Sequence, residues 1–361
     1  MKLLIGGGGT GGHIYPAIAI ARELLRRGDE HEVLFVGAER GLETSIVPKE
    51  GFIIKTLNVT GLKGRGIFSK ALSLSRLVWA VNSAARFLRE YRPDVTLGVG
   101  GFASGPVGLA TLLYRSPLTL AEQNFAPGMT NKWLGRFAKK VFVTWPGSER
   151  LFPKNVGELT GNPVRRGFFE TRRKTDSERL NILVLGGSQG ARTLNLAVAE
   201  SVDKLNTVSA SITLTAQTGE RDFDMVNGAL QRAGFPAVAQ KFFDDMPQRI
   251  ADADIVISRA GAGSIAEICA VGRGSVYVPY PYAADDHQRL NAKCAVDAGA
   301  SIMVADSDFD ADRLARIVDE FSKDRSKLVE MGKRAKSLAK PEAAKTIVDE
   351  ILKLAGGRIA A

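Results

Sequence analysis

The sequence predicts an α/β protein with two doubly wound, Rossmann-like domains that face each other across a cleft. Short apolar runs alternate with amphipathic segments along the chain, which is the order of a parallel sheet covered by helices on both faces. The same order restarts after TGNPVR (160–165). The length of 361 residues also exceeds what a single hydrophobic core commonly supports.

The boundaries of the expected elements come from apolar runs and their periodicity. In the first half, strands are expected at 1–5, 32–37, 94–101, 116–124 and 140–145, and helices at 14–28, 74–91, 104–114 and 130–138. The glycine-interrupted stretch before residue 74 receives no element. In the second half, strands are expected at 181–187, 209–219, 238–243, 254–261, 274–281 and 300–304, with helices between them.

The two domains are expected at 1–162 and 163–341. The tail is expected to be helical from Asp312, with a break at Pro341, and its last helix (342–361) to pack back on the first domain. Ligands of doubly wound sheets bind outside the carboxyl ends of the strands. We therefore expect the functional residues at those ends.

Composition narrows the class of protein. A hydrophobic content of 45% and a charged content of 24% are typical of a globular protein. No apolar run is long enough to cross a bilayer, and the start MKLLIGGGG does not have the form of a signal peptide. The 2 cysteines, Cys269 and Cys294, lack a metal-binding spacing and are expected to be free thiols in a reducing cytoplasm.

The net charge of +10 lies entirely within residues 1–165, and residues 166–361 are neutral overall. Such an asymmetry indicates an anionic partner. Nucleic acid, an anionic membrane surface and a phosphorylated substrate are the three possibilities that charge alone leaves open.

Three glycine-rich loops follow expected strands and lead into helices: GGGGTGG (6–12), GVGGFASGP (98–106) and GGSQGA (186–191). Glycines there let backbone amides approach a phosphate, and a helix N-terminus adds partial positive charge. None is a P-loop, because no Gly-Lys-Ser/Thr follows, and none is a dinucleotide fingerprint with its ribose-binding acid. One such loop can be a tight turn alone, but three at equivalent strand ends favour phosphorylated ligands.

His13, one of only 3 histidines, stands in the first turn of the helix after the first glycine loop. A neutral imidazole beside a phosphate-binding loop can act as a general base. The alternative is a locally hydrogen-bonded histidine with no catalytic role.

Two polar clusters mark the second half. In SRAGAGSIAE (258–267), Ser264 and Glu267 form a capping box worth ~1 kcal/mol, or else Glu267 binds both hydroxyls of a ribose. In PYPYAADDHQRLNA (279–292), the polar side chains suit sugar hydroxyls or a solvated loop that caps a helix. They are Asp286, His287, Gln288 and Asn291.

The ordered set GGTGGH, GGFASGP, EQN, NKWL, GNPVR, GGSQGAR, SRAGAGSIAE and DDHQ resembles the MurG family over nearly the whole chain. These enzymes are peripheral membrane glycosyltransferases with the GT-B fold. They transfer N-acetylglucosamine from UDP-GlcNAc to the 4-hydroxyl of MurNAc in lipid I with inversion, which gives lipid II and UDP in peptidoglycan synthesis.

The resemblance implies several partners for this chain. They are UDP-GlcNAc and lipid I as substrates, anionic lipid at the cytoplasmic face of the inner membrane, and other cell-wall synthesis proteins, with no nucleic acid.

The resemblance also implies a donor site mainly in the second domain. Glu267 would bind the uridine ribose, and Phe243 would lie against the uracil. Gln288, with His287 as its neighbour, would bind the sugar hydroxyls, and the division between these two stays open. The other implied donor residues are Asn124, Arg165, Thr10, Gly11, Gly12, Ser188, Gln189, Gly190, Ala262, Gly263, Ser264, Ile265 and Ala266.

For the acceptor, the resemblance implies that the first two glycine loops face the diphosphate. His13 is the leading candidate for the general base that deprotonates the attacking hydroxyl, and Glu122 is the second candidate. The transition state would be oxocarbenium-like, with UDP as the leaving group. Phe102 stands where some relatives carry Tyr, so a hydroxyl is not essential there. The acceptor-loop residues are Gly8, Gly9, Gly100, Gly101, Phe102 and Ser104.

No metal and no cofactor is expected, since GT-B enzymes generally stabilise UDP with helix dipoles and basic side chains. Asp252 and Asp254 imitate the D-x-D motif of metal-dependent transferases, but we expect a structural role for them. The aspartates of 306–312 look like the start of an EF-hand that lacks its central glycine, so helix capping is expected instead.

Residues 61–89 carry six basic side chains and no acidic one, interleaved with apolar residues. This pattern suits an amphipathic helix that packs inward, or an interfacial patch with ~1 kcal/mol of lipid attraction for each basic residue. Because the implied acceptor is a membrane lipid, we expect a membrane patch. Its residues are Lys63, Arg65, Ile67, Phe68, Lys70, Leu72, Arg76 and Trp79.

Other functions compete with the transferase. Another GT-B enzyme, such as a UDP-GlcNAc 2-epimerase or a glycolipid synthase, would use the same donor, but an epimerase needs no basic apolar patch. A nicotinamide-dependent dehydrogenase would need the missing fingerprint. A non-catalytic nucleotide-binding module would not need His13. Nucleic-acid binding fits the charge but lacks a recognition motif.

Overall fold

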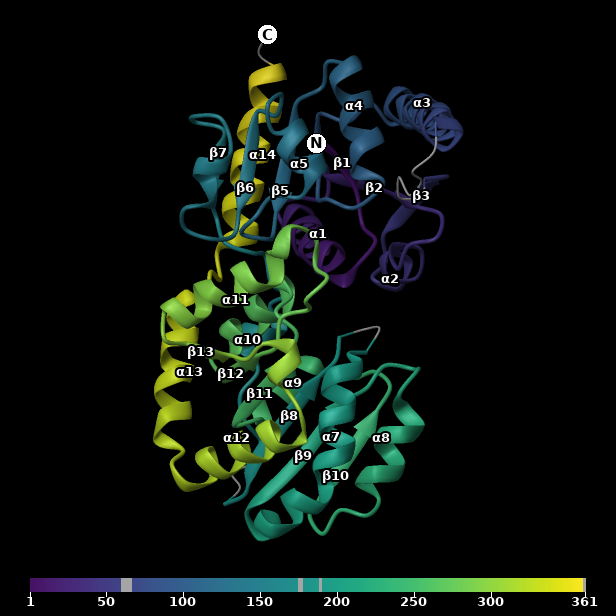
Figure 1. The fold of residues 1–361 in the computed structure, drawn as a ribbon. Helices are drawn as coiled ribbons and strands as arrows, with labels where there is room; N and C mark the ends of the chain where they lie inside the picture. The colour runs from purple at the N-terminus through teal and green to yellow at the C-terminus, as the bar shows by residue number, and fades with distance from the viewer. Residues whose placement is uncertain (60–66, 175–177, 188–189, 360–361) are drawn as a thin grey trace. The chain divides into compact units, whose positions relative to one another are not determined.

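The structure, a computed structural model, describes residues 1–59, 67–174, 178–187 and 190–359. The chain forms two compact units (Figure 1). The first is Met1–Arg165 together with Lys340–Ala361, and the second is Arg166–Ala339. Each unit contains its own parallel sheet, so the predicted pair of α/β domains is confirmed.

The sheet of the first unit has the strand order β3-β2-β1-β4-β5-β6-β7, and every pairing is parallel. Its strands are β1 (Lys2–Gly6), β2 (Glu32–Ala38), β3 (Ile53–Leu57), β4 (Val95–Gly98), β5 (Leu118–Glu122), β6 (Lys140–Val143) and β7 (Gly157–Leu159). Its helices are α1 (Gly11–Leu25), α2 (Glu43–Lys49), α3 (Ile67–Tyr91), α4 (Ser104–Leu113), α5 (Met129–Leu134), the 3-10 turn η1 (Ser148–Leu151) and α14 (Ala343–Ile359).

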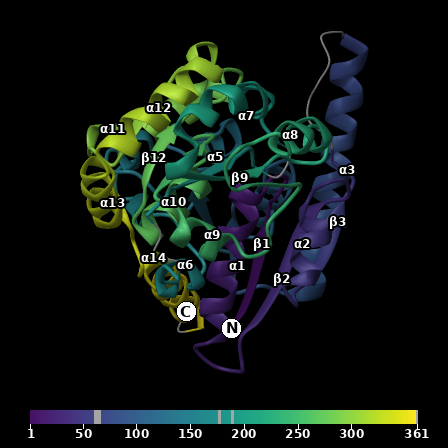
Figure 2. The same ribbon diagram turned by 90° about the horizontal axis from the view of Figure 1, so that it is seen from below.

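Helices cover both faces of this sheet because its buried side chains alternate in direction. Leu3 and Ile5 of β1 point into a cluster with α1 and α14. Leu4, between them, belongs to a separate cluster with α3 and α4. Figure 2 shows α3 beside β3 at one edge of the sheet.

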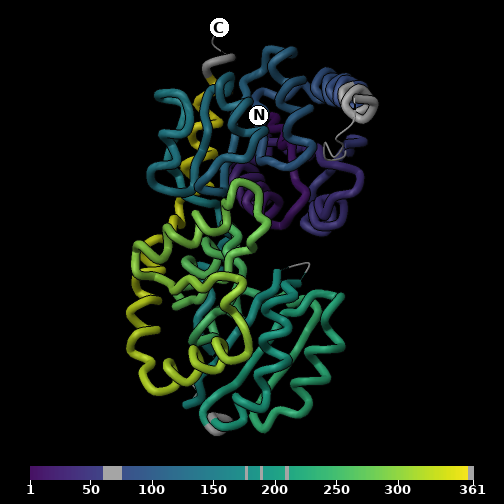
Figure 3. The backbone as a smooth tube through the Cα atoms, viewed as in Figure 1, coloured from purple at the N-terminus to yellow at the C-terminus, as the bar shows by residue number. Residues whose placement is uncertain are grey.

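The C-terminal helix α14 completes the core of the first unit. Ile347, Val348 and Ile351 are fully buried against α1. An ion pair between Arg27 and Asp349 at 2.8 Å lies beside this contact. Figure 3 shows the yellow C-terminal segment running among the teal segments of this unit.

The structure corrects the sequence analysis between β2 and α3, where no element was expected. This stretch contains α2 and β3. β3 is an edge strand with only Leu57 fully buried, so it lacks the apolar run of a central strand. α2 has only seven residues and contains Pro48, so its helical period is too short to detect.

The sheet of the second unit has the parallel order β10-β9-β8-β11-β12-β13. Its strands are β8 (Leu180–Leu185), β9 (Ile212–Gln217), β10 (Ala237–Gln240), β11 (Ile255–Ser258), β12 (Gly274–Tyr277) and β13 (Ser301–Met303). Its helical elements are α6 (Gly167–Glu170), α7 (Arg192–Leu205), η2 (Asn206–Ser211), α8 (Phe223–Leu230), α9 (Met246–Asp252), α10 (Ala262–Val271), η3 (Ala284–Asp286), α11 (His287–Asp297), η4 (Asp306–Asp308), α12 (Ala311–Lys323) and α13 (Ser326–Leu338).

Several predictions of local structure can be checked in this unit. Asp310 caps α12 by accepting a hydrogen bond from the Arg313 amide at 2.7 Å, as expected. The capping box of Ser264 with Glu267 is not formed, because α10 begins one residue after Gly261 and Ser264 lies inside the helix. Both cysteines are free, and burial raises the pKa of Cys269 to about 12.

Candidate active site

The first glycine loop follows β1, and its amides are used within the protein. Gly7 donates to the Val36 carbonyl at 3.0 Å, and Gly8 donates to the Gly100 carbonyl at 3.1 Å. The amide of Gly9 donates to Oε2 of Glu43 at 2.7 Å. Gly8 and Gly9, which were expected to bind a diphosphate, therefore have engaged amides.

The first and second glycine loops touch each other at the ends of β1 and β4. A Cβ placed on Gly101 would lie 2.2 Å from the Gly8 carbonyl oxygen, a distance that no side chain permits. Gly100 and Gly101 have φ angles of +90° and +82°, which only glycine adopts easily. The two loops thus form one tightly packed substructure.

His13 lies at this junction. Its Nδ1 is 3.2 Å from the Thr10 hydroxyl oxygen. A Cβ on Gly100 would lie 3.0 Å from its Nε2, so the imidazole packs directly against the second loop. The sequence analysis placed His13 just after the first glycine loop, and the structure shows that it also packs against the second loop.

The start of α4 has the features of an anion site. The first amides of α1 and α4 have no carbonyl partner within their own helices. The hydroxyl of Ser104, the first residue of α4, is fully buried and has no hydrogen-bond partner among the described residues. Phe102, just before it, is 61% exposed and thus accessible to a ligand.

Glu122 is a buried carboxylate that organises the next loop. Its Oε1 accepts from the amide and side chain of Asn124, and its Oε2 accepts from the Gly128 amide and the Asn131 side chain. Burial raises the pKa of Glu122, although these four hydrogen bonds oppose the change. A carboxylate with every acceptor position filled suits a role in positioning Asn124 better than a role as a base.

Arg165 is the last residue of the first unit before the chain enters the second. Its guanidinium lies over the ring of Tyr15, 4.2 Å from the centroid. Tyr15 is on α1, two residues after His13. Arg165 is thus held close to the start of α1, where the resemblance places phosphate chemistry.

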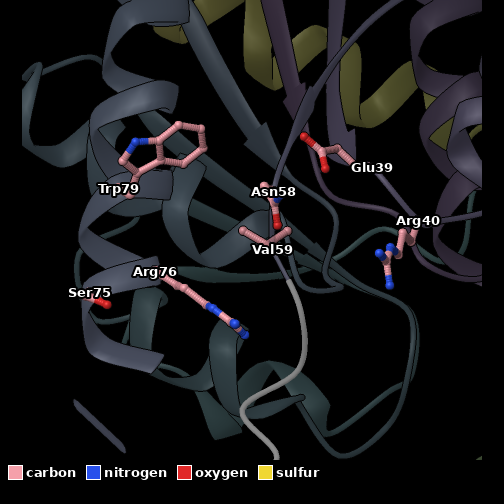
Figure 4. Close-up of a pocket in the computed structure, with 7 residues that line it drawn as sticks. All are labelled: Glu39, Arg40, Asn58, Val59, Ser75, Arg76 and Trp79. Carbon is pink, nitrogen blue, oxygen red and sulfur yellow. The ribbon is translucent and has the colours of Figure 1, made fainter. Parts of the chain in front are cut away.

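A cavity of 620 Å³ opens at the carboxyl ends of β2 and β3 (Figure 4). Arg76 and Trp79 extend into it from α3, and both are exposed. They are the part of the predicted membrane patch that the structure describes in full. The other lining residues are Glu39, Arg40, Asn58, Val59 and Ser75.

The remaining patch residues fall outside the part of the chain that can be described. Lys63 and Arg65 lie outside the described residues, as do the side chains of Ile67, Phe68, Lys70 and Leu72. Additional large apolar side chains are exposed in the same unit, on α4 and α5 and just after α5. They are Leu113, Met129, Trp133 and Phe137.

In the second unit, the expected nucleotide pocket begins at the N-terminus of α10. The side chains of Ala262 and Ile265 are buried in the core, so these residues can offer only backbone groups to a ligand. Gly263, Ser264, Ala266 and Glu267 are half-buried in the first two turns of the same helix.

Phe243 does not present its ring as expected. The ring is 2% exposed, and the Arg249 guanidinium covers it at 4.7 Å from the centroid. Its neighbour Phe242 is 49% exposed. The aromatic face available to a base in this loop therefore belongs to Phe242, and the buried ring of Phe243 anchors the loop.

Gln217, at the end of β9, connects two of the expected donor segments. Its Oε1 accepts from the Phe243 amide at 3.1 Å, and its Nε2 donates to the Gly187 carbonyl at 3.2 Å. The sequence analysis did not select Gln217, although its place at the end of a predicted strand was a usable signal. Ser188 and Gln189 lie outside the described residues, and Gly190 follows with φ +77°.

The loop before α11 holds the two sugar-binding candidates differently. His287 Nδ1 is 2.7 Å from the Ala284 carbonyl, so Nδ1 carries the proton and Nε2 is free to accept when the ring is neutral. Gln288 Oε1 accepts from the Tyr280 amide at 2.9 Å, which leaves its NH₂ group to donate. Asp285 and Asp286 have positive φ angles, a strained form common near binding sites.

Among the described residues, no cluster of three or more His, Cys, Asp or Glu side chains could hold a metal ion. Asp254 pairs with Arg173 at 2.5 Å and accepts from the Asn181 amide. Asp252 accepts from the Lys174 amide and the Gln248 side chain. Both aspartates are thus engaged within the protein, which agrees with the structural role expected for them.

Comparisons with known proteins identify the family. The glycosyltransferase family 28 N-terminal domain matches residues 3–143, and the C-terminal domain of the same family matches residues 181–347. The chain belongs to glycosyltransferase family 28.

Relatives within family 28 match over nearly their whole length. Proteins named UDP-N-acetylglucosamine–N-acetylmuramyl-(pentapeptide) pyrophosphoryl-undecaprenol N-acetylglucosamine transferase are 42% identical to this chain in Citrifermentans bemidjiense and in Myxococcus xanthus. The first alignment covers 98% of this chain and 99% of the relative, and the second covers 97% and 92%.

Solved structures agree with this assignment. Acinetobacter baumannii MurG is 28% identical with a TM-score of 0.77, and the match covers 98% of this chain and 99% of that one. A putative UDP-N-acetylglucosamine 2-epimerase from Listeria monocytogenes has a TM-score of 0.71, and the match covers 96% of this chain and 94% of that one. It is only 14% identical to this chain, so it shows the shared fold alone. The fold expected from the resemblance is thus confirmed for this family 28 chain.

Proposed function

We propose that this family 28 enzyme transfers N-acetylglucosamine from UDP-GlcNAc to the 4-hydroxyl of MurNAc in lipid I and so forms lipid II and UDP for peptidoglycan synthesis. The proposal draws on the names of relatives that are 42% identical over almost the entire chain. The single structural observation that carries it is the imidazole of His13 packed against Gly100, between the starts of α1 and α4.

His13 is the proposed general base. When Nδ1–H donates to the Thr10 oxygen, 3.2 Å away, the lone pair of Nε2 can accept the proton of the acceptor hydroxyl. That oxygen then forms a bond to the anomeric carbon, while the bond from this carbon to the diphosphate of UDP breaks. Attack from the face opposite the leaving group inverts the anomeric configuration.

The acceptor diphosphate is proposed to bind at the starts of α1 and α4, through the amides of the Gly100–Ser104 segment and of Gly11 and Gly12. The resemblance instead implied that Gly11 and Gly12 belong to the donor site. Each helix N-terminus favours negative charge, and His13 near the start of α1 packs against Gly100, just before α4. Asn124, held by Glu122, is proposed to contact the donor sugar.

The donor nucleotide is proposed to bind the second unit. The N-terminus of α10 offers amides to the nucleotide, and Glu267 on the same helix can accept hydrogen bonds from both ribose hydroxyls. Phe242 supplies the exposed aromatic face for the uracil. The NH₂ group of Gln288 and the Nε2 of His287 are both free to bind sugar hydroxyls, so we assign both to sugar recognition.

The reaction is proposed to need no metal ion. Helix N-termini and arginine side chains provide the positive charge that stabilises the leaving diphosphate. Asp252 and Asp254, which imitate a D-x-D motif, are engaged by Arg173, Asn181, Lys174 and Gln248.

The enzyme is also proposed to bind peripherally to the cytoplasmic face of the inner membrane. Within the described residues, no helix is both long enough and apolar enough to span a bilayer. Exposed Arg76 and Trp79 of α3 combine a cation with an amphipathic ring, which suits an anionic lipid interface. Contacts with other cell-wall synthesis proteins would occur at the same membrane.

An assay for the transfer of radiolabelled N-acetylglucosamine to a lipid I analogue, with EDTA present, tests this function. We expect transfer by the parent enzyme, a lower kcat for His13→Ala, and mainly a higher KM for UDP-GlcNAc for Glu267→Ala. If the folded parent binds UDP-GlcNAc but transfers nothing, the lipid I assignment fails. The epimerase alternative would then be tested by following conversion of UDP-GlcNAc alone.

A further inference from the structure

Glu43 lies in the segment that received no element in the sequence analysis, and it is a buried carboxylate held by backbone amides. It is the first residue of α2, and its side chain is only 2% exposed. Its Oε2 accepts from the Gly9 amide at 2.7 Å, and its Oε1 accepts from the Ala38 amide at 2.8 Å. One carboxylate therefore links the loop after β1 to the end of β2.

Three glycines make room for this carboxylate. A Cβ on Gly8 would lie 2.5 Å from Cδ of Glu43, one on Gly37 would lie 2.4 Å from Cγ, and one on Gly41 would lie 2.0 Å from Oε2. Real side chains do not reach such distances. Some glycines in this region are therefore needed to make room for the Glu43 side chain, and not only for a ligand.

The charge of Glu43 is balanced by backbone amides. Among the described residues, no Lys, Arg or His forms an ion pair with it. A buried carboxylate without a cation is costly unless strong hydrogen bonds satisfy it, and two short amide contacts do so here. The carboxylate thereby occupies the amide of Gly9, which could otherwise bind a phosphate oxygen.

A series of backbone contacts connects the Glu43 carboxylate to His13, the proposed base. Gly8, next to Gly9, donates to the Gly100 carbonyl and also abuts Gly101. Gly100 in turn packs against the imidazole of His13. A shift of the Gly8–Gly9 segment would therefore move the surface against which His13 rests.

We propose that Glu43 is a positioning residue for the acceptor half of the reaction. Its buried carboxylate holds the first glycine loop, sets the position of His13 through Gly100, and directs the acceptor diphosphate away from Gly9 to the starts of α1 and α4. This role rests on the proposed transferase function.

The test compares Glu43→Gln and Glu43→Ala with the full-length parent. In Glu43→Gln, one amide N–H would face an NH₂ group and lose its acceptor. We expect kcat/KM for a lipid I analogue to fall about 10- to 100-fold, which corresponds to the free energy of one charge-assisted hydrogen bond. The Kd for UDP-GlcNAc should stay within about twofold of the parent value. In Glu43→Ala, added acetate is expected to refill the site and restore kcat.

Glu23→Gln is the matched control. Glu23 is also a buried carboxylate of the first unit, 7% exposed, but Arg26 and Arg27 satisfy it on the far end of α1. We expect this variant to lose stability with unchanged kcat/KM. If Glu43→Gln behaves in the same way as Glu23→Gln, or if acetate restores nothing in a folded Glu43→Ala protein, the positioning role is overturned.

A readout that does not depend on turnover separates this proposal from the proposed function. The imidazole NMR signals of His13 are expected to shift in Glu43→Gln and to stay in place in Glu23→Gln. Should the parent fail to transfer sugar, the transferase assignment falls while the NMR comparison still decides whether Glu43 positions His13. Unchanged His13 signals in Glu43→Gln would contradict the proposal whatever the activity.

Discussion

The imidazole of His13 rests on the backbone of Gly100, so closely that a Cβ there would come 3.0 Å from Nε2. The two residues come from different βα units and meet because β1 and β4 are neighbours in the sheet. The contact joins the proposed base to the loop proposed to hold the acceptor diphosphate. Perturbing either residue should therefore affect the same step.

Gly100→Ala is predicted to lower kcat by more than tenfold. The new methyl group would push the imidazole, and the φ of +90° would add about 1–2 kcal/mol of backbone strain. Gly51→Ala is the matched control, because Gly51 has φ +84° with nothing within 4 Å and lies outside the proposed site. Both variants should lose stability in thermal unfolding, and Gly100→Ala should lose more because its methyl group also contacts His13. Equal kcat values for the two would rule out a role for the His13–Gly100 contact.

Phe242→Ala is predicted to affect mainly donor binding, whereas Phe243→Ala is predicted to affect mainly stability. Phe242 is exposed, so its removal should change the unfolding free energy by less than about 0.5 kcal/mol and raise the KM for UDP-GlcNAc. Phe243 is buried, and its removal should cost about 3–5 kcal/mol. Chemical denaturation and donor kinetics measure both. A destabilised Phe242→Ala with normal KM would show that the exposed ring is structural.

Asp222 is predicted to make the stability of the second unit sensitive to acid. Burial alone would raise the pKa of Asp222, but hydrogen bonds from Asn195 and Arg192 lower it overall. The folded pKa lies below the unfolded one, so its contribution is complete above about pH 4 and is lost as the pH falls through the folded pKa.

Asp222→Asn should therefore be less stable than the parent at pH 7 and lose less stability between pH 4 and pH 2 in denaturant titrations. Asp312→Asn is the control, since Asp312 pairs with Lys204 on an exposed surface where solvent weakens the interaction. Parallel pH profiles for the parent and Asp222→Asn would contradict this account.

Arg76→Gln is predicted to weaken binding to vesicles that contain phosphatidylglycerol by about fivefold. This factor corresponds to ~1 kcal/mol for each basic residue near an anionic surface. Trp79→Ala should weaken binding to the same vesicles, because Trp79 is 61% exposed and its indole suits the interface. Arg232→Gln, an exposed arginine of the second unit, should have no effect in cosedimentation. Equal binding by all variants would remove α3 from the membrane patch.

Much of the architecture followed from local pattern. Alternating apolar and amphipathic segments predicted the central strands, since a buried parallel strand needs a continuous apolar run that is visible in the sequence. The edge strand β3 and the short helix α2 were missed because half-exposed elements carry weaker periodicity. Glu43 was missed with them.

By itself, the sequence determined that this protein has two α/β domains, that three glycine loops follow their strands and that His13 stands at the first of them. Tertiary structure alone decided which of those glycine amides are engaged, since Glu43 contacts Gly9 from 34 positions away. It also decided that Phe242 and not Phe243 is exposed. The physical reason is that periodicity reports local conformation, whereas burial and hydrogen-bond partners arise only when segments far apart in the chain pack together.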